Sequence, residues 1–491
     1  MANLPLELAK IKEEIEGYAR AYGLDFFQTI FEILEFEELN QVASYGGFPT
    51  RYPHWSFGME YDQLSKGYEY GLSKIYEMVI NNDPCYAYLL KSNPIVDQKL
   101  VMSHVYGHCD FFKNNYWFSK TDRRMIDTTA NHSTRVRRYI DEHGHDVIES
   151  YLDTCLSLEN LIDPNAPFYK PRKPEEEVPQ EVRKLKSKDY MDSFINPPDY
   201  MEKQQKKIDE DKKKKQKYPV EPLRDVLYFL INHAPLENWE RDILTMVRKE
   251  ALYFAPQAQT KIMNEGWASY WHSKMMTQKI LSGSEIIDYA DHHAGTLATS
   301  QGQLNPYKIG IELFRDIEDR WNKGKFGKEY DDCNDIREKK YWDRKQGLGT
   351  EKIFEVRKIY NDVMFIDEFL TEEFCSKHKF FSFEYNPKTT QYEIFSRAFQ
   401  TIKKKLLQSL TNRGQPFIFV EDSNFENRSE LLLMHRHEGV DLKLDWASST
   451  LENIFRIWKK PVNLLTVVDE KGKILTFDGK EHKSRFTENT K

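Results

Sequence analysis

Two histidines one helical turn apart carry the strongest chemical signal in this sequence. His104 and His108 fall within residues 100–112, where the apolar positions have helical spacing. Residues four apart lie on the same face of an α-helix, so both imidazoles can reach one divalent cation. Val101 and Phe112 share that face, which turns the pair inward, and a buried polar ring needs a partner. A metal ion is one such partner; the alternative is a pair of core histidines bonded to backbone or side-chain groups.

A buried carboxylate is expected on a second helix. Helical geometry over residues 261–276 places Glu265 on the same stripe as Ala268 and later apolar residues. A carboxylate aimed into an apolar core is costly unless it meets a cation or several donors. His104, His108 and Glu265 together would form the two-histidine, one-carboxylate set of many catalytic zinc sites, which leaves a fourth position for water. We therefore predict these three residues as metal ligands, with Zn²⁺ as the expected ion.

The predicted site lacks one group that zinc peptidases use. In peptidases of the HExxH type, a glutamate follows the first histidine and polarises the metal-bound water, whereas this position is Val105 here. Asp110 and His272 are predicted as catalytic replacements for that glutamate. The glycine-flanked His143 and His145 are alternatives, and none of the four has the expected spacing.

His272 is predicted to act near the metal without binding it directly. It lies two helical turns after Glu265, roughly 10 Å along the helix axis. That distance suits a contact with a metal-binding side chain or with substrate better than direct binding of the same ion beside Glu265. Residues 291–293 (Asp-His-His) and 305–307 (Asn-Pro-Tyr) are weaker candidates for the border of the same cleft. The alternative for these two segments is a polar turn and a helix start.

The segments that carry these residues have the periodicity of helices. Residues 6–22 predict an amphipathic helix, with Gly23 placed where a left-handed cap would sit. A helical pattern from residue 61 to about 162 predicts an all-helical body there. Helical spacing returns over residues 223–276 and 307–321, so the body is expected to continue beyond the intervening region.

A smaller domain of mixed structure is expected at the C-terminus. Beyond about residue 340, β-branched and aromatic residues become frequent, and residues 462–477 have the pattern of a β-hairpin. The predicted fold class is α+β and predominantly α-helical, with zincin-like helices in a large helical body. The predicted parts are residues 1–162 (N-terminal part of the helical body), 163–222 (a charged, proline-rich excursion or linker), 223–340 (second part of the helical body) and 341–491 (the C-terminal α+β domain).

Composition excludes several classes of protein. The 491 residues include 40% hydrophobic and 14% aromatic residues, which excludes disorder over the whole length. The net charge of −7 disfavours a general binder of nucleic acid or anionic membrane. A membrane-spanning helix and a signal peptide are not expected, so the cytoplasm is the predicted location. The five cysteines lack CxxC spacing and are expected to be reduced core residues.

Several longer strings resemble one protein family. These strings, in chain order, are residues 48–58 (FPTRYPHWSFG), 70–77 (YGLSKIYE), 104–115 (HVYGHCDFFKNN), 263–272 (MNEGWASYWH) and 305–307 (NPY). They resemble motifs of the stage V sporulation protein R (SpoVR) family, and the resemblance extends over nearly the whole chain. Because these motifs are long and occur in the family's order, the resemblance is more specific than any single short pattern.

The resemblance implies a bacterial cytoplasmic protein that takes part in forming the spore cortex of endospore formers. It also implies a PrkA-type serine protein kinase and a von Willebrand-like protein as partners in stress responses. The family's histidine and glutamate motifs look like the helices of zincin-type metallopeptidases, but no settled activity comes with them. Two hypotheses remain: a metal-dependent hydrolase with His104, His108 and Glu265 as ligands, and a non-catalytic regulatory or scaffold protein with a structural metal or none.

Overall fold

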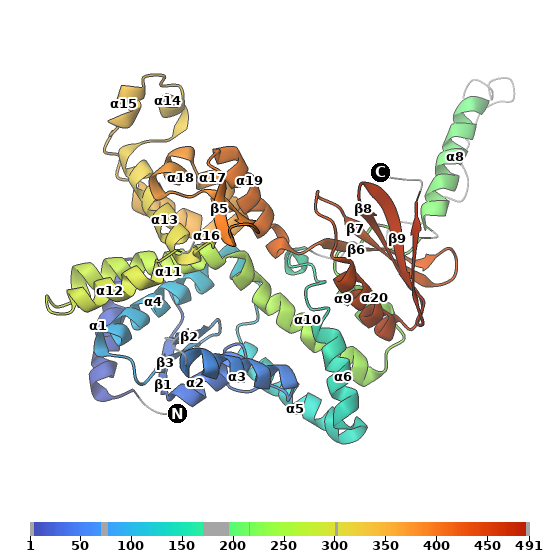
Figure 1. Cartoon of the computed structure of the whole chain (residues 1–491), viewed down its shortest axis with the longest axis horizontal. Helices are drawn as coiled ribbons and strands as arrows, with labels where there is room; N and C mark the ends of the chain where they lie inside the picture. Colours follow the sequence, from blue (N-terminus) through green and yellow to red (C-terminus); the bar gives the residue numbers. More distant parts are fainter. Residues whose placement is uncertain (1–3, 70–76, 170–195, 216, 300–302, 488–491) are drawn as a thin grey trace. The chain divides into compact units, whose positions relative to one another are not determined.

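The structure, a computed structural model, describes residues 4–69, 77–169, 196–215, 217–299 and 303–487 (Figure 1). The described chain forms two compact units, each built from two separate stretches of sequence. The first unit contains residues 1–144 and 253–414, and the second contains residues 145–252 and 415–491. These units differ from the four predicted ranges, because residues 341–414 pack within the first unit and residues 145–252 accompany the C-terminal sheet.

The first unit is mainly helical, as the sequence predicts. Its helices are α1 (Leu6–Ala21), α2 (Phe36–Ser44), α3 (Trp55–Glu69), α4 (Ile95–Asn114), α5 (Met125–His143), α11 (Lys261–Met275), α12 (Ile286–Thr296), α13 (Pro306–Lys323), α14 (Gly327–Asp331), α15 (Ile336–Lys340), α16 (Gly349–Ile359), α17 (Asp362–Phe369), α18 (Glu372–His378) and α19 (Phe399–Leu410). Helix α10 (Asn238–Gln259) begins in the second unit and ends in the first, and a π-helical turn, η4 (Met276–Ile280), follows α11.

The predicted all-helical stretch from residue 61 to 162 is wrong at two strands. A small sheet has the order β1 (Thr29–Leu34), β3 (Cys85–Leu90) and β2 (Glu77–Ile80), with β1 parallel and β2 antiparallel to β3. Both faces of β3 are largely buried, so its residues lack the polar–apolar alternation that reveals a half-exposed strand. A hairpin of β4 (Ser382–Asn386) and β5 (Gln391–Ser396) completes the strands of this unit among the described residues.

The centre of the first unit is a layer of helices in backbone contact. Figure 1 shows α11 lying along α4, and α11 also packs on α13. A Cβ atom on Gly107 of α4 would lie 2.6 Å from the Cα of Ala268 on α11, and one on Gly266 would lie 2.4 Å from the Cα of Gly310 on α13. Glycine at these positions therefore lets the three helices approach more closely than larger side chains would allow.

The second unit combines helices with a mixed sheet. Its helices are α6 (His145–Leu156), α8 (Pro198–Lys215), α9 (Val226–His233) and α20 (Leu444–Trp458), and its strands are β6 (Phe417–Phe425), β7 (Glu430–Arg436), β8 (Val462–Val468), β9 (Lys471–Phe477) and β10 (His482–Phe486). The sheet order is β10-β9-β8-β7-β6, with only β7 and β8 parallel. The hairpin predicted over residues 462–477 is confirmed as β8 and β9. Residues 170–195 of the predicted excursion lie outside the described residues.

The cysteines and the lengths of the helices complete the description of the fold. The five cysteines are free thiols, and four of them are buried. No helix in the described ranges combines the length and the apolar character needed to cross a bilayer.

Candidate metal centre

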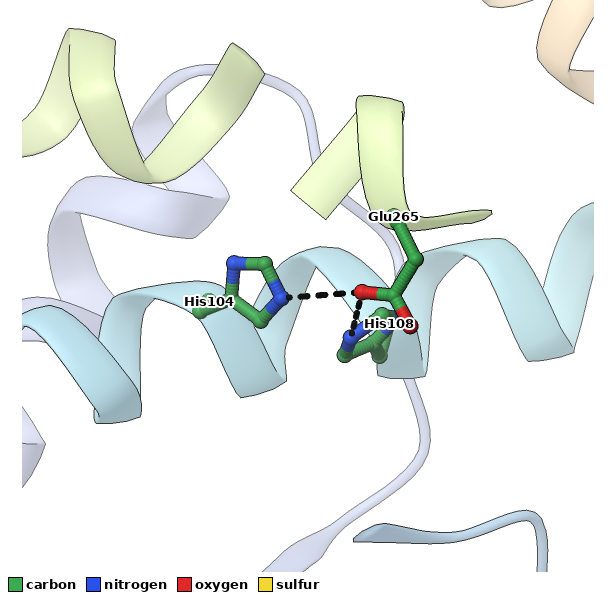
Figure 2. A group of neighbouring side chains, drawn as sticks. All are labelled: His104, His108 and Glu265. Carbon is green, nitrogen blue, oxygen red and sulfur yellow. Dashed lines mark ion pairs between the residues drawn. The ribbon is translucent and has the colours of Figure 1, made fainter. Parts of the chain in front are cut away.

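Three of the predicted site residues meet between α4 and α11. The Nε2 atoms of His104 and His108 each lie 3.4 Å from Oε2 of Glu265. One ligand atom from each residue can be chosen so that all three lie within 4.8 Å of one another. Figure 2 shows the two imidazoles rising from one helix toward the carboxylate of the other. All three side chains are buried, with exposures of 3%, 5% and 6%.

The local sequence explains this convergence. Helix α4 is buried on nearly its whole circumference, so its two histidines face other protein rather than solvent. Gly107 precedes His108 and Gly266 follows Glu265, and each glycine sits at a close helix–helix approach. The short separation of the helix axes lets two imidazoles and one carboxylate reach a common point.

The far side of His108 is fixed by a hydrogen bond. Its Nδ1 lies 2.9 Å from Oδ1 of Asn264, and because that oxygen is an acceptor, Nδ1 donates the hydrogen. When that ring is neutral, its Nε2 carries a lone pair that faces Oε2 of Glu265. Two acceptors that face each other repel, so this pair requires a cation or an additional proton between them. Histidine ligands of metals commonly donate their second N–H in this way.

The far side of His104 leads into a chain of histidines. Nδ1 of His104 lies 2.8 Å from Nδ1 of His272, and Nε2 of His272 lies 3.2 Å from Nδ1 of His293. If His104 keeps a lone pair at Nε2 for a metal, its Nδ1–H donates to His272, which in turn donates to His293. Burial, together with His104 and His293, holds the pKa of His272 well below its usual value, so that ring is neutral.

Glu265 is held by a cation on its other oxygen. Lys261, one helical turn earlier and half exposed, donates from Nζ to Oε1 at 2.6 Å. Burial alone would raise the pKa of Glu265, but His108, His104 and Lys261 outweigh it and hold that pKa well below its usual value. Glu265 is therefore ionised and presents Oε2 to the histidines.

The two gaps between a histidine nitrogen and the glutamate oxygen suit a small divalent cation. A direct charge-assisted N–H···O bond is about 2.7–2.9 Å long, shorter than the gaps found here. Two ligand atoms that are each about 2.1 Å from a tetrahedral zinc ion lie about 3.4 Å apart. Both Nε2–Oε2 distances equal 3.4 Å. The donor set of two imidazoles and one carboxylate therefore fits Zn²⁺.

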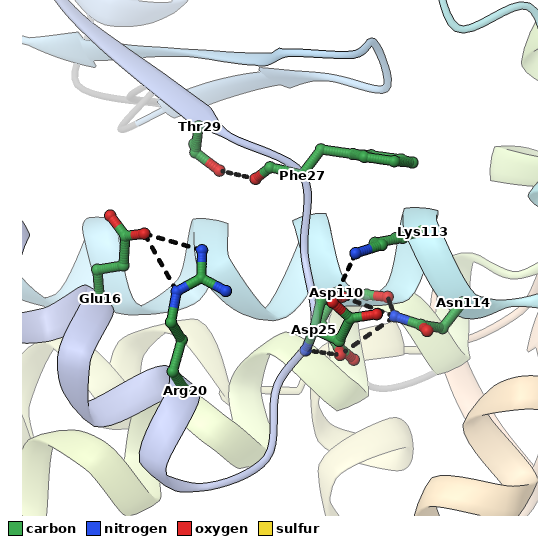
Figure 3. Close-up of polar contacts among 8 residues, drawn as sticks. All are labelled: Glu16, Arg20, Asp25, Phe27, Thr29, Asp110, Lys113 and Asn114. Carbon is green, nitrogen blue, oxygen red and sulfur yellow. Dashed lines mark hydrogen bonds and ion pairs between the residues drawn. The ribbon is translucent and has the colours of Figure 1, made fainter.

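Asp110, predicted as catalytic, lies away from these ligands. Its Oδ1 accepts the backbone N–H of Asp25 at 2.8 Å, and its Oδ2 accepts the indole N–H of Trp267 at 2.8 Å, with Arg357 Nε 3.4 Å away. Figure 3 shows the carboxylate beside Asp25 and Asn114. Burial raises the pKa of Asp110 to about 6 despite Arg357 and these donors. The geometry gives Asp110 a role in joining α4, α11 and α16.

The remaining candidates divide into two groups. His143 pairs with Glu142, and His145 pairs with Asp146 and Glu149, all of them close neighbours in the sequence. The segments 291–293 and 305–307 do approach the site. His293 reaches it through His272, and the ring of Tyr307 stacks on His104 with 6.1 Å between centroids.

Two residues that hold the ligands were not predicted from the sequence. Lys261 precedes Glu265 by four residues, a spacing that signals an ion pair on one helix face. Asn264 is adjacent to Glu265, and its contact with His108 depends on the way α4 crosses α11, which no local pattern encodes.

Comparisons with known proteins agree with the motifs. Residues 4–415 match the protein family described as "SpoVR like protein". The uncharacterized protein YcgB of Escherichia coli strain K12 is 33% identical over 395 residues, which cover 75% of this chain and 73% of that protein. No solved structure matches the chain. The family match covers more than four-fifths of the sequence, including every proposed metal ligand. The chain therefore belongs to the SpoVR family.

Proposed function

We propose that this protein is a metal-dependent hydrolase or amidase that takes part in spore cortex formation in the cytoplasm. Its substrate would be a small cytoplasmic molecule or a cortex precursor. His104, His108 and Glu265 would hold one Zn²⁺. The same proposal includes a PrkA-type serine protein kinase and a von Willebrand-like protein as partners, which co-purification with the tagged protein tests.

One observation carries this proposal. Two buried histidines and one ionised glutamate converge with 3.4 Å between the nitrogen and oxygen atoms, while Asn264, His272 and Lys261 engage the opposite side of each ligand. A group whose ligands and supporting contacts are both in place is typical of metal centres.

The residues around the proposed ion have separable roles. When bound, Zn²⁺ would lower the pKa of a water molecule and polarise a carbonyl group. Lys261 orients the carboxylate of Glu265, and His272 orients the ring of His104. Both ring nitrogens of His272 are engaged by other histidines, so it is a positioning residue. Tyr307, partly exposed and stacked on His104, is the proposed proton donor or acceptor for substrate.

A structural metal in a regulatory or scaffold protein is the second candidate function. The position of the usual glutamate base is Val105, which is fully buried in the apolar core. The three ligands are at most 6% exposed, which is also typical of a closed structural site. Both candidates include the same ion and differ in whether substrate reaches it.

Complementation in a sporulating host separates the two functions. The expected result for the hydrolase is that Tyr307→Phe retains metal and normal protein levels, yet yields spores with reduced cortex and reduced heat resistance. His435→Ala is the control for the loss of a buried histidine, because His435 is buried in the second unit and forms a hydrogen bond with Thr466. Normal cortex from a His104→Ala, His108→Ala double variant at wild-type protein level would contradict both metal-dependent functions. Normal cortex from Tyr307→Phe alone would favour the structural metal.

A further inference from the structure

A second polar pocket lies beside the histidine chain, between α11, the π-helical turn η4, α12 and α13. Its volume is about 320 Å³. The charged, imidazole and amide side chains of its lining are Lys274, Gln278, His293, Arg315 and Glu318. None of them belongs to the three proposed metal ligands. His293 links the pocket to the metal centre through its hydrogen bond with His272, and the ring of Tyr289 also contacts that of His272.

The negative charge in this pocket is already paired. Oε1 of Glu318 lies 3.3 Å from Nζ of Lys274, and the hydroxyl of Thr350 donates to the same oxygen at 3.3 Å. Among the lining residues, Lys274 and Arg315 are cationic and Glu318 is anionic. Burial lowers the pKa of His293, so that ring is neutral. The lining residues alone therefore have a net charge of +1, and Glu312, which pairs with Arg315 from outside the lining, balances that charge.

Hydrogen-bond donors remain available in the same pocket. Arg315 uses two of its five N–H donors, one toward Oε1 of Glu312 at 3.0 Å and one toward Oγ of Ser273 at 3.3 Å. Lys274 donates to Glu318 and to the hydroxyl of Tyr270, which leaves its third N–H. The hydroxyl of Tyr22 donates to Oε1 of Gln278 at 2.7 Å. The oxygen of the Gln278 amide is thus engaged, and its NH₂ group is the part that can donate to a ligand.

The backbone also departs from regular helix here. Residues 276–280 form a π-helical turn, and Gln278 belongs to it. Single π-helical turns within or after α-helices occur frequently at functional sites, because the wider turn redirects side chains. The turn thus places an amide donor beside two cations that lie on α11 and α13.

We propose that this pocket binds the oxyanion group, carboxylate or phosphate, of a small molecule. Arg315 is the principal contact, since its planar fork matches both oxyanions. Lys274 and Gln278 supply the other donors. The volume exceeds that of a bare oxyanion, so the ligand carries an organic part that rests on the tyrosines of the lining. This site is separate from the proposed metal centre and requires no metal.

Titration calorimetry of the full chain, treated with a chelator, tests this inference. The probes are inorganic phosphate and acetate, each titrated at low and at physiological ionic strength. We expect at least one probe to bind, more weakly as salt is added. Tighter binding of phosphate would identify a phosphoryl-bearing ligand, and tighter binding of acetate a carboxylate. No binding of either probe would overturn the proposal.

Matched variants assign the binding to this pocket. Arg315→Gln is expected to lower the affinity for the probe at least about tenfold, because it removes a charge-assisted hydrogen bond. Glu318→Gln removes the competing negative charge and is expected to strengthen binding several-fold. Arg124→Gln is the control: it removes an exposed ion pair with Asp127 and should leave the affinity for phosphate and for acetate unchanged. Unchanged affinity in folded Arg315→Gln, or weaker binding in Glu318→Gln, would contradict the assignment. Because no metal is present in these titrations, their result is independent of the proposed hydrolase.

Discussion

Gly107 on α4 and Ala268 on α11 bring the two helices of the proposed metal centre into backbone contact. A Cβ atom on Gly107 would lie 2.6 Å from the Cα of Ala268. The adjacent residue, His108, reaches Glu265 only because the helices are this close. The packing of small residues is thus the structural cause of the ligand geometry.

Replacing Gly107 should therefore damage both folding and metal binding. Gly107→Ala forces the helices apart or strains them, and overpacking of this kind typically costs about 1–3 kcal/mol. We expect a lower melting temperature and weaker metal binding, measured by thermal unfolding and chelator competition. Gly295→Ala is the control, because Gly295 lies in α12 with no atom within 4 Å of an added Cβ. It should be neutral or slightly stabilising. Equal behaviour of the two variants would contradict this account of the packing.

Asn264 and His272 should tune the affinity of the site without supplying ligands. Asn264→Ala and His272→Ala each remove a contact on the far side of a histidine. Losses of this kind weaken metal binding by about 10- to 100-fold. Chelator competition measures the affinity. Asn115→Ala serves as the control, since Asn115 is a buried amide that bonds the backbone of Arg357 and Tyr360. Complete loss of metal in His272→Ala would make His272 a direct ligand.

Asp110 should contribute to stability and leave metal content unchanged. Removing one partner of a buried charge pair costs about 3–5 kcal/mol, and Asp110→Ala leaves Arg357 without this carboxylate. Asp110→Asn, which keeps an acceptor for Trp267, should cost less. Chemical denaturation gives the free energy of unfolding, and elemental analysis gives the metal content. A folded Asp110→Asn variant that keeps its metal but fails to complement would restore the catalytic role predicted from the sequence.

The pH dependence of stability should include a contribution from Asp362. This buried carboxylate accepts the backbone N–H groups of Ile262 and Met263 at the start of α11. Burial raises its pKa from 3.8 to about 7. Between about pH 4 and 7 the folded chain keeps a proton on Asp362 that the unfolded chain has lost. Protonated Asp362 therefore contributes to the free energy of unfolding at low pH, and this contribution is lost as the pH rises through 7.

Asp362→Asn removes that titration. The free energy of unfolding of the wild type, minus that of the variant, should fall from pH 5 to pH 8 by at least about 1 kcal/mol. Urea denaturation at several pH values measures the difference. A difference that stays constant, or rises with pH, would show that Asp362 does not hold a raised pKa in the folded state.

The sequence predicted the parts of the site that follow from local periodicity. His104 and His108 are one turn apart, and Glu265 lies on a buried stripe, so inward placement followed from helical geometry. The same geometry argues against Asp110 as a partner of these ligands. A step of two residues from His108 turns about 200° around the helix, which directs Asp110 to a different neighbour.

Features that depend on tertiary contacts were not predicted from the sequence. The contact of Asn264 with His108 requires knowledge of how two helices cross. Strand β3 is apolar on both faces and short, so its pattern does not separate strand from helix. The pairing of residues 145–252 with the C-terminal sheet joins segments distant in sequence, which composition along the chain does not reveal.

The metal content of the purified protein tests the central claim most directly. Wild-type protein, isolated without chelator, exposed to Zn²⁺ and dialysed, should contain about one zinc ion per chain by elemental analysis. Glu265→Ala treated in the same way should contain little or none, because it removes the charged ligand that both histidines face. A wild type without metal, or a Glu265→Ala variant with as much zinc as the wild type, would contradict the assignment of His104, His108 and Glu265 as a metal centre.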